Sequence, residues 1–264
     1  MDDRPLPMVP PLKLFAEVYG SGPPLIILHG LFGSLDNWHT MSRRLGEGNR
    51  VFAVDQRNHG RSPHSELFTY DAMREDLRQF TVDRGLPRAS LLGHSMGGKT
   101  AMEFALAYPD KVEKLIVVDI APRTYPRQHD HLLEALGALD LARYRTRREV
   151  EDALGEYVAS IPVRTFLMKS LKRAEDGRFS WKMNLGAIQA NYDEVNRAVP
   201  GGRVFPGPAL FIRAQSAQYI SDEDAEGIRA LFPRAQVVPI DAGHWVHAES
   251  PEPFFQAVRQ FLNS

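Results

Sequence analysis

Short apolar runs that alternate with helical patterns constrain the fold of this chain more than any other feature. Each run is continuously apolar and is bounded by Gly, Pro or charged residues, as is typical of strands buried on both faces. Helix-forming stretches separate several of them, and this order predicts a parallel sheet with right-handed crossovers. The runs cover residues 25–28, 51–54, 90–92, 115–118, 209–212 and 236–240, and the helical stretches 70–84, 96–108, 222–231 and 251–262.

The alternation is interrupted once, over residues 122–207. The composition there turns to Arg, Leu, Ala and Glu at helical spacing, and Pro and Gly mark the end of the segment. A chain of 264 residues suits a large core with an insertion. We therefore predict an α/β core over 1–121 and 208–264 and an all-helical cap over 122–207. The cap is expected above the crevice in which α/β sheets bind ligands.

The sequence GHSMG at residues 93–97 predicts a reactive serine. It joins an apolar run to a stretch rich in Ala, Met, Glu and Leu, which Pro109 closes. Strand, Gly-x-Ser-x-Gly and helix in this order form a nucleophile elbow, which exposes the Oγ of Ser95 at the end of the strand. Gly93 and Gly97 fit because the turn brings strand and helix too close together for Cβ atoms. The alternative is a tight glycine turn with an incidental serine.

A serine nucleophile needs a base and an oxyanion hole. His244 follows the run 236–240 and precedes the final helical stretch, so we predict that it is the base. The N–H of Met96, directly after the serine, is the first expected oxyanion donor. The N–H of Leu31, in the loop after the first apolar run, is the second, with Phe32 as the next choice.

Two carboxylates are candidates for the acid that orients the histidine. Asp119 stands at the end of the run 115–118, directly before the insertion. Asp222 is the first carboxylate after the run 209–212, but it follows Ser221 at a helix start, where the helix dipole alone favours a negative charge. We favour Asp119 because of its place at the carboxyl end of a strand.

Apolar and aromatic side chains near the serine and in the insertion are candidates for a substrate pocket. The alternative, preferred for any single residue of the insertion, is packing inside the cap itself. For His247, three residues after His244, we expect either packing or binding at the cap face. The predicted substrate-binding residues are Phe32, Phe166, Trp181, Met183 and His247.

The polar sequence DQRNHGRS at residues 55–62 has a structural and a functional interpretation. It closes the second apolar run and is dense in turn-forming residues. It can form a polar wall of the pocket, or a hydrogen-bonded turn that holds the oxyanion loop. We favour the structural interpretation.

Composition excludes several other classes of function. The chain has no cysteine, which rules out a cysteine nucleophile and disulfides, and its net charge of −1 gives no reason to expect nucleic acid or an anionic membrane as partner. No His, Asp or Glu cluster has metal spacing, and we expect no cofactor. Residues 1–11 lack the pattern of a signal peptide, and the longest apolar runs, of about six residues, are too short for stable membrane insertion. We expect a cytoplasmic protein with a small-molecule substrate.

Five motifs in order resemble the α/β-hydrolase superfamily, in particular the YbfF-type bacterial esterases and their mitochondrial relatives. The resemblance implies a mostly parallel eight-stranded sheet, a helical cap after the sixth strand, and hydrolysis of carboxylic esters or acyl thioesters. It also implies that Asp119 is the acid. Residues 213–216, RAQS, depart from the pattern, because similar proteins usually carry glycines there. The motifs are HGLFGS at 29–34, DxRNHGxS at 55–62, GHSMGG at 93–98, VDIAP at 118–122 and AGHWVH at 242–247.

These features predict a serine carboxylesterase that acts through an acyl-enzyme on Ser95. Dehalogenases and epoxide hydrolases of this superfamily carry an aspartate at the elbow, so the serine argues against both. A C–C bond hydrolase or a perhydrolase would use the same residues. A ligand receptor that retained the fold is the alternative from a different class.

Overall fold

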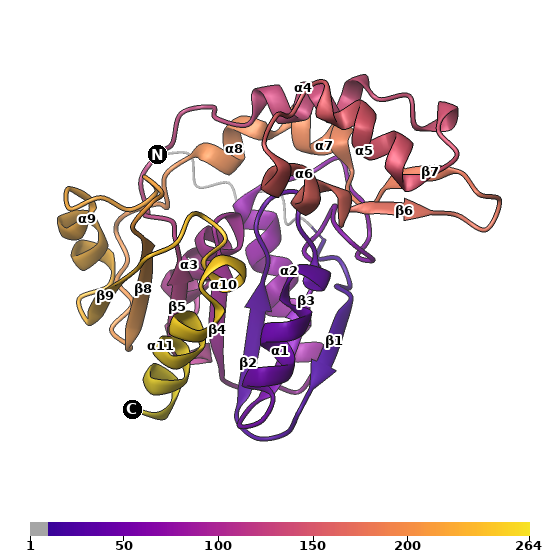
Figure 1. Ribbon diagram of the computed structural model, residues 1–264. Coiled ribbons are helices and arrows are strands. Elements are labelled where there is room, and N and C mark those ends of the chain that lie inside the picture. Colours follow the sequence, from indigo (N-terminus) through magenta and orange to yellow (C-terminus); the bar gives the residue numbers. More distant parts are fainter. Residues whose placement is uncertain (1–9) are drawn as a thin grey trace, which may run out of the picture.

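A seven-stranded sheet, six strands of it parallel, forms the centre of the protein (Figure 1). The structure, a computed structural model, describes residues 10–264; most of the stretch 1–11, in which no signal peptide is predicted, lies outside them. The strand order is β1-β3-β2-β4-β5-β8-β9, and only β1 is antiparallel to its neighbour. The strands are β1 (Ala16–Tyr19), β2 (Pro24–Leu28), β3 (Arg50–Val54), β4 (Ala89–His94), β5 (Val112–Val118), β8 (Ala209–Ala214) and β9 (Ala235–Ile240).

All six predicted strands are present, and the sequence analysis missed β1. This edge strand, AEVY, is only partly buried and therefore lacks the continuous apolar run that identifies the others. The expected count of eight strands is wrong for the described part of the chain, which has seven in the main sheet. The 122–207 segment accordingly follows the fifth strand rather than the sixth.

Alternate side chains of each central strand enter two different apolar cores. In β2, Ile26 and Leu28 pack with the helices α2 and α3 on one face, while Leu25 and Ile27 pack with α1 and α11 on the other. Burial on both faces explains why these strands read as unbroken apolar runs. The helices of the sheet layer are α1 (His39–Leu45), α2 (Tyr70–Asp83), α3 (Met96–Ala107), α9 (Asp224–Leu231), α10 (Val246–Glu249) and α11 (Pro251–Asn263), with 3-10 turns at Leu35–Trp38 and Pro109–Lys111.

The segment between β5 and β8 crosses the carboxyl ends of the strands, at the top of Figure 1. Its apolar cluster includes Leu31, Phe32 and Met96 of the sheet layer, so the segment packs directly on the loops around the serine. Its division from the rest as a separate cap stays a prediction. The segment contains α4 (Asp130–Ala138), a 3-10 turn (Leu141–Arg143), α5 (Arg147–Gly155), α6 (Ile161–Met168), β6 (Leu171–Arg173), β7 (Phe179–Trp181), α7 (Leu185–Ala190) and α8 (Tyr192–Asn196).

The expectation that this segment is all-helical is wrong, because β6 and β7 form an antiparallel hairpin. Its turn passes through Gly177, whose φ of 84° lies in the left-handed region that glycine adopts at little cost. Leu171, Phe179 and Trp181 are buried on one side of the hairpin. Three-residue strands are too short for the period-two alternation to stand out in the sequence.

None of the helices in residues 10–264 combines the length and the hydropathy needed to cross a bilayer.

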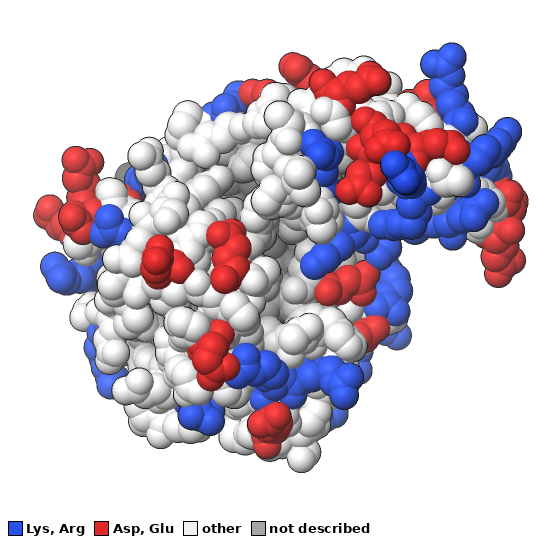
Figure 2. Space-filling model, viewed as in Figure 1, with Lys and Arg blue, Asp and Glu red and all other residues white. Residues whose placement is uncertain are grey.

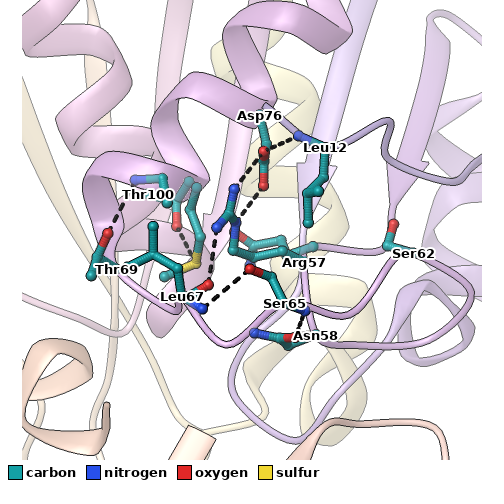
Figure 3. Close-up of polar contacts among 12 residues, drawn as sticks. Leu12, Arg57, Asn58, Ser62, Ser65, Leu67, Thr69, Asp76 and Thr100 are labelled. Atoms are coloured by element: carbon teal, nitrogen blue, oxygen red, sulfur yellow. Dashed lines mark hydrogen bonds and ion pairs between the residues drawn. The ribbon is translucent and has the colours of Figure 1, made fainter. Parts of the chain in front are cut away.

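A buried ion pair anchors the turn 55–62 to α2 (Figure 3). Arg57 donates from Nε to Asp76 Oδ2 at 2.6 Å and from Nη2 to Oδ1 at 2.8 Å, and both side chains are 1% exposed. The N–H of Leu12 donates to the same carboxylate at 2.6 Å, and Arg57 Nη1 donates to the carbonyl of Leu67 at 2.9 Å. The turn is a hydrogen-bonded support, as its composition predicted.

We expect Asp76→Asn to lower the free energy of unfolding by about 3–5 kcal/mol, because it leaves the Arg57 guanidinium buried without a counter-ion. Glu113→Gln is the matched control, since Glu113 pairs with Arg88 on the surface with both side chains about half exposed. That change should cost less than about 1 kcal/mol. Urea denaturation of the two variants measures both values, and equal losses would show that the buried pair contributes no more than the exposed one.

Candidate active site

Ser95 lies at the sharp turn between β4 and α3, in a backbone conformation that few serines adopt. Its φ is 53° and its ψ is −119°, a combination outside the main allowed regions. Its N–H donates to the carbonyl of Val118 at 3.0 Å, which ties the turn to the end of β5. Such conformations cost of order 1–3 kcal/mol and persist only where the surrounding packing fixes them.

Two glycines allow that packing. A Cβ on Gly93 would lie 2.2 Å from the carbonyl oxygen of Gly97, and a Cβ on Gly97 would lie 2.4 Å from the carbonyl oxygen of Leu28. Both contacts are with backbone, which cannot move aside. The start of α3 therefore lies against the carboxyl ends of β2 and β4, as the spacing of the motif predicted.

The structure brings His244 and Asp119 together. His244 Nδ1 lies 2.8 Å from Asp119 Oδ2, and the N–H of Ala214 donates to Oδ1 at 3.1 Å. The Asp119 side chain is fully buried at the end of β5. Asp222, the alternative, is 96% exposed and pairs with Arg213 at 2.5 Å. The carboxylate in contact with the histidine is therefore Asp119.

Burial sets the protonation of this pair. It lowers the pKa of His244 to about 3, so the ring is neutral at pH 7. Burial also raises the pKa of Asp119, to about 7, and the N–H of Ala214 opposes that rise by favouring the carboxylate. A neutral ring that donates from Nδ1 to Asp119 keeps Nε2 as a proton acceptor.

Contacts that the sequence analysis missed hold the His244 loop in place. The Glu249 carboxylate accepts from the N–H of Gly243 at 2.7 Å and from the N–H of Trp245 at 3.2 Å. The His94 ring, next to the serine, lies with Nε2 2.9 Å from the carbonyl oxygen of His244. Glu249 and His94 lie next to or within the sequence motifs, but nothing in the sequence indicated that they hydrogen-bond to residues 243–245.

The loop 29–34, called the oxyanion loop because it carries the predicted donor Leu31, is fixed by two hydrogen bonds to the Phe32 backbone. Phe32 has a φ of 62°; its N–H donates to His59 Nε2 at 3.3 Å, and its carbonyl accepts from Ser170 Oγ at 2.5 Å. Phe32, the second choice as oxyanion donor, is therefore already engaged. Among the hydrogen bonds of the described residues, none uses the N–H of Leu31 or of Met96. Both donors remain available to a ligand.

Ser95 and His244 line one cavity of about 330 Å³ between the sheet and the 122–207 segment. Phe32 and Phe166 also line it, as predicted from the sequence, together with aliphatic residues of the segment such as Val158. Within residues 10–264 the Ser95 hydroxyl makes no hydrogen bond to the His244 ring. Figure 2 shows a hollow beneath the segment with mainly uncharged side chains around it, while lysines and arginines gather toward the end that carries β6 and β7.

Three predicted substrate-binding residues do not line this cavity, and the prediction is corrected for them. Trp181 and Met183 are buried in the apolar cluster of the segment, where Trp181 Nε1 donates to the carbonyl of Leu136 at 3.3 Å. His247 is stacked on Trp38, with ring centroids 4.0 Å apart and planes 12° apart. All three pack within the protein, which is the alternative that their apolar surroundings favoured.

Two aromatic residues at the cavity were not recognised from the sequence. Tyr219 stacks on the His244 ring at 4.0 Å, and His129 bonds through Nδ1 to the hydroxyl of Tyr192 at 2.8 Å. Tyr219 lies in the loop after β8, and nothing in the sequence marked this aromatic ring as a partner of His244. In the part of the chain that the structure describes, no group of three or more His, Asp or Glu side chains is arranged to hold a metal ion.

A mostly parallel sheet, a serine at a strained strand-to-helix turn and a histidine after the last strand define the α/β hydrolase class. Comparison with known proteins agrees: the chain belongs to the α/β hydrolase fold family, whose model matches residues 23–251.

Several relatives have named activities. The chain is 35% identical over 245 residues to "Esterase YbfF" of Escherichia coli (strain K12), covering 91% of this chain and 93% of that protein. It is 39% identical over 249 residues to "sn-1-specific diacylglycerol lipase ABHD11" of Mus musculus, covering 91% and 81%. Among solved structures, a "Marine microorganism esterase" superposes with a TM-score of 0.92 at 43% identity, covering 95% of this chain and 99% of that one.

We expect His59→Gln to flatten the pH dependence of stability. Burial lowers the pKa of His59 to about 3, whereas an unfolded histidine titrates near 6.5. The unfolded chain therefore binds a proton that the folded chain does not, and stability falls as the pH drops below 6.5. Between pH 7 and pH 5 the wild type should lose about 2 kcal/mol more than the variant. The glutamine keeps an acceptor for the Phe32 N–H, and equal losses in urea denaturation would contradict the assignment.

Proposed function

We propose that this protein is a serine esterase that hydrolyses carboxylic esters through an acyl-enzyme on Ser95. The observation that carries the proposal is His244, hydrogen-bonded to buried Asp119, on the same cavity as Ser95 and Leu31, whose N–H is free. The free N–H of Met96 belongs to the residue directly after the serine. The relatives named esterase and lipase support ester bonds as the target.

The reaction proceeds in two acyl transfers. His244 Nε2 takes the proton of Ser95 Oγ as the oxygen attacks the ester carbonyl, and Asp119 holds the imidazolium that forms. The tetrahedral intermediate collapses, the bond to the alcohol oxygen breaks, and His244 returns its proton to that oxygen. Water, deprotonated by His244, then attacks the acyl-enzyme and releases the acid and the serine. An acyl thioester would follow the same route, with a thiol as leaving group.

Backbone donors stabilise the charge that develops on the carbonyl oxygen. The N–H of Met96 is at the start of α3, where the helix dipole also favours a negative charge. Each donor contributes about 3 kcal/mol to the lowering of the barrier when it points at the oxyanion. We further propose that residues 122–207 act as a cap that keeps water from the apolar part of the cavity.

A labelling experiment tests the nucleophile and the acid together. We expect a fluorophosphonate to modify Ser95 of the wild type and to leave Ser95→Ala unmodified, as read by mass spectrometry of the peptides. Asp119→Asn should lower kcat for a p-nitrophenyl ester by up to about 10⁴-fold, because the histidine loses its orienting partner. Asp222→Asn, at an exposed residue away from the cavity, should stay within about twofold of the wild type.

Binding of a small ester without labelling or turnover would favour the receptor alternative. Cleavage of a 1,3-diketone with no activity on esters would favour the C–C hydrolase.

We expect Ser170→Ala to lower kcat roughly tenfold with a smaller change in KM, because it releases the Phe32 carbonyl and lets the oxyanion loop move. Ser42→Ala is the matched control: Ser42 is also fully buried, but its hydroxyl has no partner among the described residues and lies away from the cavity. Ester kinetics and thermal unfolding of the two variants separate positioning from stability. A loss in Ser170→Ala that appears only in the melting temperature would refute the coupling.

A further inference from the structure

A buried lysine lies beside the serine and has no part in the mechanism above. Lys99 is one helical turn after Ser95 on α3, and it is 1% exposed. It lines a chamber of about 30 Å³ to which Ser95, Leu31 and Met96 also contribute. Since Ser95 and Leu31 line the main cavity too, the two spaces meet at the serine.

The ammonium group of Lys99 is held by carbonyls and an aromatic face, not by a carboxylate. Nζ donates to the carbonyl of Asn196 at 3.2 Å and to that of Arg197, and it lies 4.9 Å from the ring centroid of Tyr125. In residues 10–264 no carboxylate oxygen comes within 4 Å of Nζ; Glu103, on the same helix, pairs with the Arg197 guanidinium at 2.6 Å. Burial lowers the pKa of Lys99 to about 7.

A buried cation without a counter-ion is costly, and an anion that enters the chamber relieves that cost. Two carbonyls engage two of the three ammonium hydrogens, which leaves one for a ligand. The chamber has room for about two water molecules, which is also the size of a carboxylate group.

The position of His244 decides which part of an ester enters which space. His244 must return its proton to the leaving oxygen, and it lines the main cavity but not the small chamber. The alcohol therefore leaves through the main cavity. That leaves the small chamber, which also opens at the serine, for the end of the acyl group.

We propose that a free carboxylate at the end of the acyl group occupies this chamber and pairs with Lys99, while the methylene groups of the acyl chain lie near Ser95, where the two spaces meet. The preferred substrates are then esters of short dicarboxylic acids in which one carboxyl group is free. This inference rests on the proposed esterase function and adds the acyl specificity of the same site.

A pair of esters of equal shape tests it. Methyl hydrogen succinate ends in a carboxylate, and methyl 4-methylpentanoate ends in an isopropyl group of similar size. We expect the wild type to have a kcat/KM at least tenfold higher for the first ester. Lys99→Met should reduce the ratio of the two kcat/KM values to one or below.

Lys114→Met is the matched control. Lys114 also donates to two backbone carbonyls, those of Phe261 and Leu262, but it lines neither space. The control should keep the wild-type ratio. A ratio near one in the wild type, or an unchanged ratio in Lys99→Met, would overturn the proposal.

Fluorophosphonate labelling of Ser95 distinguishes failure of the carboxylate-subsite proposal from failure of the proposed esterase function. Labelling with turnover of both esters at equal rates refutes only the carboxylate subsite, whereas no labelling and no turnover refutes both.

If Lys99→Met does not fold, the wild type still decides the matter. N-methylsuccinamate should then slow its labelling at least tenfold more than N,4-dimethylpentanamide does, and equal protection would refute the subsite.

Discussion

The close approach of α3 to the carboxyl ends of β2 and β4 is the constraint on which the rest of the site depends. Without side chains at Gly93 and Gly97 the helix start comes within van der Waals contact of the strand carbonyls, and Ser95 is forced to a φ of 53°. That conformation is unfavourable on its own, so the apolar packing on both faces of the sheet must hold it. Because Met96 directly follows Ser95 at the start of α3, the same turn brings the serine oxygen and the Met96 N–H close together.

Strain of this kind is concentrated around the cavity. In the described part of the chain four residues other than glycine have positive φ, and Phe32, Ser95 and Asp119 are three of them. Each stands just after a parallel strand, β2, β4 or β5, and these strands are neighbours in the sheet. The Phe32 backbone is further fixed by the hydrogen bond that its N–H donates to His59 of the turn 55–62 and by the one that its carbonyl accepts from Ser170 of the 122–207 segment. Ser170 therefore links that segment directly to the backbone of the oxyanion loop.

Features that leave a pattern in neighbouring residues could be predicted from the sequence, whereas features that depend on three-dimensional packing could not. Continuous apolar runs identified six strands, and GHSMG identified the turn at Ser95, because burial on two faces and the absence of Cβ atoms leave traces in neighbouring residues. The half-exposed β1 and the short hairpin β6–β7 leave no such trace. Whether Trp181 faces the cavity or the core depends on the packing of the whole segment, and Lys99 gave no sign that it is buried. The roles of the site residues, the cap boundary and the cytoplasmic location stay predictions.

Environment distinguishes His244, the proposed base, from the other eight histidines of the chain. Burial lowers the pKa of His29, His59, His94 and His247 as it does that of His244, so a neutral ring alone does not select it. His244 is the histidine that contacts a carboxylate in the described structure and also lines the cavity with Ser95. The contact matters because a carboxylate hydrogen-bonded to the ring favours its protonated form. In the proposed mechanism, Asp119 therefore balances the charge that His244 acquires when it takes the serine proton.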